Sequence, residues 1–233
     1  MKLLKTLKIA ALAVTPLLLL GCDSQDSNGN RVSLGTSNTS YSLAGLQYQE
    51  QFVVQVTNPQ GDPSPNTNVS FKLQPLSYNK GLYVPTDIDE PPDGIADRWG
   101  PNVTTSCNSE DTNNNGTLDA GEDVNANGTL EPSVPAITAH PDPDLTPTIL
   151  PGTSSLITDE NGFGYLAVTY PKSEASWVRL NLTAEAQDGL AGNIATYSWT
   201  LRFVIDDIDD LTVDPPGGVS SPYGTAANCT DPN

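Results

Sequence analysis

Two short segments rich in acids and amides, between residues 111 and 131, carry the clearest chemistry in the sequence. They are copies of one pattern at an offset of 12 residues. Each copy places oxygen-bearing side chains at alternate positions, followed by a glycine and, two positions further on, an apolar residue. Carboxylate and amide oxygens gathered by a tight turn are the donors that a hard divalent cation requires. The spacing therefore predicts a cation site.

The pattern resembles the calcium loop of the EF-hand. The resemblance implies side-chain ligands at positions 1, 3 and 5, a backbone carbonyl at position 7, a direct or water-mediated ligand at position 9 and a bidentate acid at position 12. Glycine at position 6 permits the sharp turn. The implied Ca²⁺ ligands are Asp111, Asn113, Asn115, Thr117, Asp119 and Glu122 in the first loop, and Asp123, Asn125, Asn127, Thr129 and Glu131 in the second.

The second copy departs from this pattern. Its position 12 is Val134, which cannot coordinate, and Pro132 at position 10 prevents a helix from starting in the usual register. Neither copy is flanked by an amphipathic helical pattern, and asparagine at positions 3 and 5 keeps the charge low. We therefore expect weak affinity, on the order of 10⁻⁴ to 10⁻³ M. The alternative is that both segments are Asn/Gly-rich surface turns.

A further acidic segment covers residues 87–97. With Gly94 set at position 6, Pro91 falls at position 3 and Gly100 at position 12, so the segment fails as a standard loop. Calcium binding in a looser geometry is the alternative that the spacing leaves open.

The N-terminal residues predict a location. Three lysines precede an apolar run over residues 9–20 that is too short for a membrane span. The run ends in Leu19-Leu20-Gly21-Cys22, which resembles the lipobox of bacterial lipoproteins. The resemblance implies a signal peptide over residues 1–21, a lipid anchor on Cys22 and a place in the cell envelope, at the outer membrane or the periplasmic face of the inner membrane. Asp23, the residue after this cysteine, weakly favours retention of the protein at the inner membrane. The alternative is an ordinary signal peptide with a chance cysteine.

The charge excludes some partners. Residues 1–21 contain three of the ten basic residues and no acid, so the rest of the chain has seven basic residues against 28 acidic ones. A surface this acidic opposes binding to nucleic acid and adsorption to anionic membranes. It supports calcium binding only because the loops are present.

Alternating apolar residues predict an all-β body. No convincing helical period follows residue 21, and the alternating runs are separated by turns such as residues 58–66 and 159–162. Short strands with polar turns at this spacing favour an antiparallel sandwich. The apolar positions are Phe52, Val54 and Val56; Val69, Phe71 and Leu73; Leu166, Val168 and Tyr170; Val178, Leu180, Leu182 and Ala184; and Tyr197, Trp199, Leu201, Phe203 and Ile205.

Two turn motifs resemble those of bacterial immunoglobulin-like domains of the invasin/intimin type. They are GDPSPN at residues 61–66, followed by VSF, and TDENGF at residues 158–163. The resemblance implies an immunoglobulin-like sandwich over residues 42–213, interrupted by a long irregular calcium-loop insertion at about 82–150. Residues 22–41 are then a flexible tether and residues 214–233 a C-terminal tail. Such modules have structural, adhesive or protein-binding roles, so we expect an envelope or surface protein as partner.

Two cysteines remain once Cys22 is assigned to lipid. In an oxidising envelope we expect Cys107 and Cys229 to pair and to hold the tail against the insertion. The alternative is two free or intermolecular thiols.

Signals for an enzyme are weak. The sequence contains no nucleophile elbow, phosphate loop or HExxH pattern. We expect the single histidine, His140, to be solvated, and the acids at positions 206, 207, 209 and 210 to form a solvated strand edge. The alternatives to a binding module are an enzyme or accessory acting on envelope glycans, which a deep cleft lined by tyrosines and acids would favour, and an assembly factor for a surface appendage.

Overall fold

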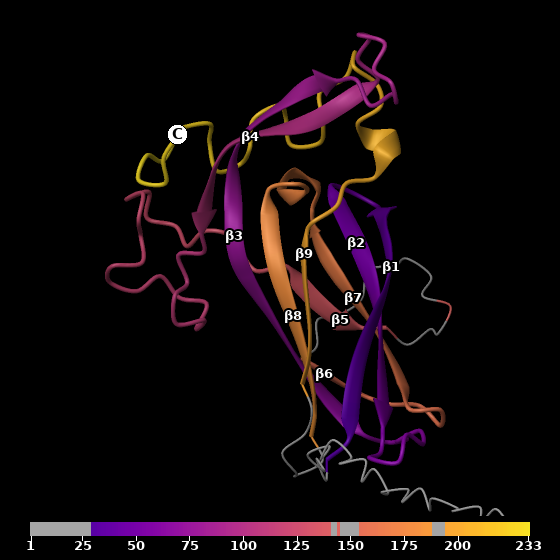
Figure 1. Cartoon of the computed structure of the whole chain (residues 1–233). Helices are drawn as coiled ribbons and strands as arrows, with labels where there is room; N and C mark the ends of the chain where they lie inside the picture. Colours follow the sequence, from indigo (N-terminus) through magenta and orange to yellow (C-terminus); the bar gives the residue numbers. More distant parts are fainter. Residues whose placement is uncertain (1–28, 141–143, 145–153, 188–193) are drawn as a thin grey trace, which may run out of the picture.

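The computed structural model describes residues 29–140, 144, 154–187 and 194–233 (Figure 1). Within these residues the chain forms β-strands and two short 3₁₀ turns, and no α-helix. None of the described segments could cross a membrane as a helix. The strands are β1 (Arg31–Leu43), β2 (Gln47–Thr57), β3 (Asn68–Thr86), β4 (Arg98–Asn108), β5 (Ala136–Ala139), β6 (Ser155–Ile157), β7 (Phe163–Pro171), β8 (Val178–Ala186) and β9 (Ile194–Thr200).

The strands build two antiparallel sheets that pack face to face. One sheet has the order β1-β2-β7-β5, and the other has the order β4-β3-β8-β9 with β6 paired to β3. Phe52 on β2 reaches across the sandwich to Trp199 on β9, with ring centroids 5.0 Å apart. The predicted all-β, antiparallel sandwich is confirmed.

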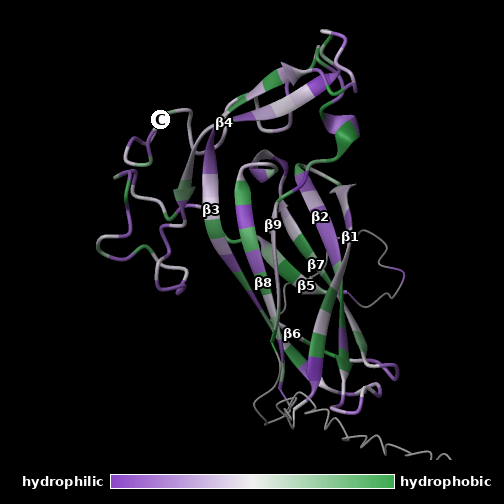
Figure 2. Ribbon diagram, viewed as in Figure 1, coloured by the Kyte–Doolittle hydropathy of each residue, from purple (hydrophilic) through white to green (hydrophobic). Residues whose placement is uncertain are grey.

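Period-two alternation explains which residues fill the core. Along β7, Leu166, Val168 and Tyr170 are fully buried, and along β8 the same holds for Leu180 and Leu182. Successive strand residues point to opposite faces, so each run presents one apolar face to the opposite sheet. Figure 2 shows this apolar alternation on the strands of the sandwich.

The first strand begins inside the segment predicted to be a flexible tether. β1 starts at Arg31 and pairs with β2 from Arg31↔Thr57 onwards. Val32 and Leu34 pack against the core while the residues between them are polar. An edge strand pairs on one side only and tolerates a polar outer face. Within residues 31–40, which were predicted to be tether, only Val32 and Leu34 therefore marked this strand in the sequence.

The predicted irregular insertion contains ordered strands. β3 runs for 19 residues, pairing first with β8 and then, beyond the sandwich, with β4. The two strands form an arm above the sandwich (Figure 1). At Gly81 the register shifts, and a Cβ atom there would lie 2.2 Å from the carbonyl oxygen of Asn102, so only glycine fits without movement.

β5 lies in the proline-rich stretch that the sequence predicted to be irregular. It pairs with β7 through Ile137↔Val168 and Thr138↔Ala167. His140 follows at the end of this strand and is buried, with 5% exposure, and its backbone amide donates to the Tyr165 carbonyl. The expectation of a solvated histidine was wrong, because the short strand carries the residue into the sandwich edge.

The last predicted strand is shorter than expected. β9 ends at Thr200, and the chain turns through a 3₁₀ segment, η2 (Ile205–Asp207). Asp207 accepts hydrogen bonds from the Tyr48 hydroxyl and the Lys172 ammonium, each at 2.7 Å. Asp207 therefore ties this end of the chain to the sandwich, whereas Asp206 and Asp209 are exposed as predicted.

The C-terminal residues contain no strand or helix, yet they pack along β3. Tyr83 donates its backbone amide to Val219, and Gly81 exchanges backbone hydrogen bonds with Ser221 and Gly224. The Tyr223 ring is buried 4.7 Å from that of Tyr78. The tail of residues 214–233 is thus fixed by backbone pairing as well as by its cysteine.

Candidate metal centre

The repeat segment leaves the arm directly after β4. Cys107 near the end of β4 and Cys229 in the tail lie at disulfide distance, with Cα atoms 5.5 Å apart, as the sequence predicted. Ser109 donates its backbone amide to Leu76 of β3 at 3.0 Å. The repeats are therefore held at their start by both β3 and the tail. They project beside the sandwich (Figure 1).

The first loop turns its predicted side chains inward. The Asp111 carboxylate accepts hydrogen bonds from the backbone amides of Asn115 and Gly116, at 3.0 and 2.9 Å. Both Asn113 and Asn115 direct their amide groups to the same Asp119 oxygen at 2.8 Å. These hydrogen bonds join residues of the loop that are up to six positions apart in the sequence.

Glu122 closes the first loop. One of its carboxylate oxygens accepts hydrogen bonds from the Thr112 amide and hydroxyl, at 2.9 and 2.7 Å. The other accepts from the Asp119 amide at 3.0 Å. The Asp119 amide, together with the Thr112 hydroxyl, lowers the pKa of Glu122. The carboxylate is thus held in its ionised form, which is the form that binds metal.

The second loop repeats these contacts. Asp123 accepts from the backbone amides of Asn127 and Gly128, both at 3.0 Å. Asn125 and Asn127 direct their amide groups to the two oxygens of Glu131, both at 2.8 Å. The second copy is therefore as well formed as the first, even though its position 12 is valine.

Thr117 and Thr129 have exposed side chains in their loops. The Thr129 hydroxyl donates to the Asn127 side chain at 2.6 Å. Their predicted contribution is a backbone carbonyl, so an exposed side chain is compatible with it.

One acid beside the loops was missed by the sequence analysis. Glu110 is 1% exposed and accepts hydrogen bonds from the backbone amides of Val124 and Glu131. Burial raises the pKa of its carboxyl group, and these two amides oppose the rise. A signal was available, because Glu110 precedes Glu122 by the same 12 residues that separate the two loops.

The residues of the two loops suit calcium. Their side chains supply carboxylate and amide oxygens, the hard donors that Ca²⁺ prefers. Asp111 and Glu122 are nearly buried, yet the ion pairs among the described residues are Lys172–Asp207 and Arg202–Glu50, which leaves both loops without a cationic side chain. Each asparagine would present its oxygen to a cation after rotation of its amide group. A cation would supply the positive charge that these buried acids lack.

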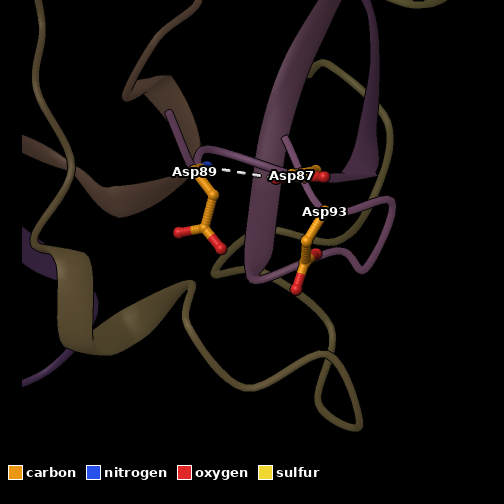
Figure 3. Close-up of side chains that lie close together, drawn as sticks. All are labelled: Asp87, Asp89 and Asp93. Atoms are coloured by element: carbon orange, nitrogen blue, oxygen red, sulfur yellow. Dashed lines mark hydrogen bonds between the residues drawn. The ribbon is translucent and has the colours of Figure 1, made fainter. Parts of the chain in front are cut away.

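A second group of acids lies at the tip of the arm. Carboxylate oxygens of Asp87, Asp89 and Asp93 come within 4.8 Å of one another (Figure 3). Asp87 accepts from the Gly94 amide at 2.7 Å. The standard register places Asp89 at position 1, Pro91 at position 3 and Asp93 at position 5. The structure adds Asp87, which lies two residues before position 1, and a fixed loop register does not include that residue.

A groove of about 730 Å³ lies between β1, the chain after β9 and the arm. Arg98 and Arg202 line it together with Asn38 and Phe203. Arg202 is held by the fully buried Glu50, to which the Tyr170 hydroxyl also donates at 2.9 Å. Neither an acid nor a tyrosine is among the residues that line the groove.

No protein-family model matches the chain, and comparison with curated proteins finds no match. The sandwich is therefore described by its own strands and pairing, and the likeness to immunoglobulin-like modules and lipoproteins is carried by the sequence motifs alone. Cys22 and Asp23 lie outside the described residues.

Proposed function

We propose that this chain is a lipid-anchored cell-envelope protein with a calcium-stabilised, immunoglobulin-like module. The module serves a structural, adhesive or protein-binding role toward an envelope or surface protein. Lipidation of Cys22 supplies the membrane attachment. Calcium bound by the repeats keeps the insertion in one conformation beside the sandwich.

The repeated oxygen-lined loops carry this proposal. Ca²⁺ takes six to eight oxygen ligands, and each loop offers acids and amides that are linked by hydrogen bonds within the loop. The buried residues of this segment include Glu110, Asp111, Glu122 and Asn125, all polar. A cation is the group that would hold such a segment together, because it has little apolar surface to bury.

The two cysteines at disulfide distance support the envelope location. Disulfides persist in oxidising compartments such as the bacterial periplasm. Loops of low charge suit the same surroundings, where calcium is far more concentrated than in the cytosol and weak sites can still be filled.

The groove beside β1 offers none of the carboxylates that glycoside hydrolysis uses, although Tyr78, Glu110 and Glu122 line a smaller pocket of about 340 Å³ next to the repeats. Glycoside hydrolysis ordinarily uses two carboxylates placed on either side of the scissile bond. The groove is lined instead by arginines, amides and an aromatic ring. Such a surface suits recognition of a partner.

Limited proteolysis of the full chain in calcium and in chelator tests the calcium part of the proposal. We expect millimolar calcium to protect residues 85–135 from cleavage, while the sandwich survives chelation. Identical cleavage in both conditions would reduce the repeats to surface turns.

Metabolic labelling with palmitate tests the anchor. We expect the wild-type chain to label and to fractionate with membranes, and Cys22→Ser to do neither. A Cys22→Ser chain that still labels would contradict the assignment of the lipobox.

A further inference from the structure

The two calcium loops are alike in their hydrogen bonds as well as in their sequence. In both, the aspartate at position 1 accepts from the backbone amides of positions 5 and 6, at 2.9 or 3.0 Å. In both, the residue at position 4 has a positive φ, 59° at Asn114 and 59° at Ala126. The second loop is therefore a structural copy of the first. The acid that takes the place of Glu122 in the second loop can be found by comparing the hydrogen bonds of the two loops.

Glu122 is the acid that closes the first loop, and its hydrogen bonds define that role. Its two oxygens accept from the amides of Thr112 and Asp119, and its own amide donates to the Asp119 carbonyl at 3.1 Å. These three contacts hold the carboxylate between Thr112, which follows Asp111, and Asp119. The Thr112 hydroxyl donates to the same oxygen as the Thr112 amide, and acceptor capacity remains because a carboxylate accepts at about four sites.

Glu110 makes the same three contacts in the second loop. Its two oxygens accept from the amides of Val124 and Glu131, at 3.0 and 3.1 Å, and its own amide donates to the Glu131 carbonyl at 2.8 Å. Val124 and Glu131 follow Thr112 and Asp119 by 12 residues. Val134, at the formal position 12, is 46% exposed. The acid that closes the second loop, Glu110, therefore lies before the repeat in the sequence, whereas Val134 lies after it.

The surroundings of Glu110 point to a cation. The side chain is 1% exposed, and neither ion pair of the described residues includes it. Burial of a carboxylate is costly unless a positive charge or a metal compensates it. Backbone amides alone do not fill all of its acceptor sites and carry no net positive charge.

We propose that Glu110 is the bidentate acid of the second calcium site, so that the repeats bind two ions. This inference rests on the calcium binding proposed above. It also links the sites, because Glu110 adjoins Asp111 of the first loop and Glu122 adjoins Asp123 of the second. Each ion then orders the residue next to a ligand of the other, and binding is cooperative.

Equilibrium dialysis of the full chain, purified in detergent, against radioactive calcium tests the assignment. Glu110→Gln and Glu122→Gln should each release one ion relative to wild type, and the double variant should release two. Glu110→Gln combined with Asp123→Asn should release only one, because both changes act on the same ion. Glu160→Gln, an exposed acid in a distant turn, is the matched control and should release none. Circular dichroism shows whether each variant retains the sandwich.

The outcomes separate this inference from the proposed function. Loss of one ion in Glu122→Gln with none lost in Glu110→Gln would overturn the role of Glu110 and leave the first site intact. If Glu110→Gln proves unfolded, retention of the full number of ions by Asp123→Asn would equally overturn it. A wild-type chain that takes up no calcium at millimolar concentration would overturn both proposals.

Discussion

The sandwich and the repeat segment are stabilised by different interactions. In the sandwich, fully buried side chains such as Phe52, Leu166 and Leu180 meet across two sheets. In the repeat segment the buried side chains are acids and amides, and the hydrogen bonds run from side chains to nearby backbone amides. Figure 2 shows the difference, with apolar residues along the strands and mainly polar ones in the loops.

One fold can therefore contain two regions that are held in place by different interactions. Burial of apolar surface provides about 25 cal/mol per Å² and requires no ligand. Acids brought together without cations repel one another, so under the proposed function the repeat segment depends on a bound ion as well as on its attachment through Cys107. Calcium should therefore affect one region strongly and the other hardly at all.

Phe52→Ala should have the largest effect. The ring lies between Tyr197 and Trp199 and is fully buried, so its removal leaves a cavity and should lower the free energy of unfolding by about 3–5 kcal/mol. The loss should be the same in calcium and in chelator, as measured by urea unfolding. The control is Leu46→Ala, an exposed turn residue expected to change stability by less than about 0.5 kcal/mol. A loss that depends on calcium would break the separation of the two regions.

Removal of the link between the regions should have the next largest effect. Replacing both cysteines (Cys107→Ser and Cys229→Ser) removes a cross-link between residues that are 122 positions apart. This change should lower the free energy of unfolding by about 2–4 kcal/mol. Thermal unfolding with and without reductant gives the measurement. Two alkylatable thiols in the native wild-type protein would contradict the bridge itself.

Glu122→Gln should remove most of the stabilisation by calcium at the first site. At tenfold saturation of one site this amounts to about 1.4 kcal/mol of unfolding free energy. In chelator the variant and the wild type should unfold alike, because the sandwich does not use this residue. The difference in melting temperature between calcium and chelator measures the effect. An undiminished calcium effect would exclude Glu122 as a ligand.

The ion pair between Lys172 and Asp207 should contribute least. Burial opposes ionisation of Asp207, but hydrogen bonds from Lys172 and Tyr48 outweigh it and lower the pKa of the carboxyl group. An acid with a lowered pKa stabilises the fold above its ordinary titration range, near pH 4, and loses this effect as the pH falls below it. Lys172→Met should therefore cost less than about 1 kcal/mol at pH 7 and progressively less towards pH 3, in both calcium and chelator. A constant difference across this range would rule out the ion pair as its cause.

The alternation of apolar residues was sufficient to predict the sandwich. Side chains on a strand alternate between faces, so runs such as Val178-Arg179-Leu180 within β8 reveal both the strand and its buried face. Strands at the edges were harder to predict. β1 has only Val32 and Leu34 as apolar side chains in its first ten positions, and β5 has four residues among prolines, because an edge strand has fewer neighbours to satisfy.

The same division applies to the candidate site. The 12-residue repeat was visible in the sequence, because ligands at positions 1, 3 and 5 of one loop are set by local backbone geometry. The closing contacts were not local. Glu110 reaches Val124 and Glu131 across the whole repeat, and Asp87 joins Asp89 and Asp93 from outside the standard loop register.

Local spacing thus determined which residues of this protein are donors and which strands form its core. Tertiary structure decided which donors meet. It brought Glu110 to the second loop in place of Val134, Cys229 to Cys107, and Asp207 to Lys172. Contacts between residues distant in the sequence depend on how the sheets, the arm and the tail pack, and no periodicity within one segment records that packing.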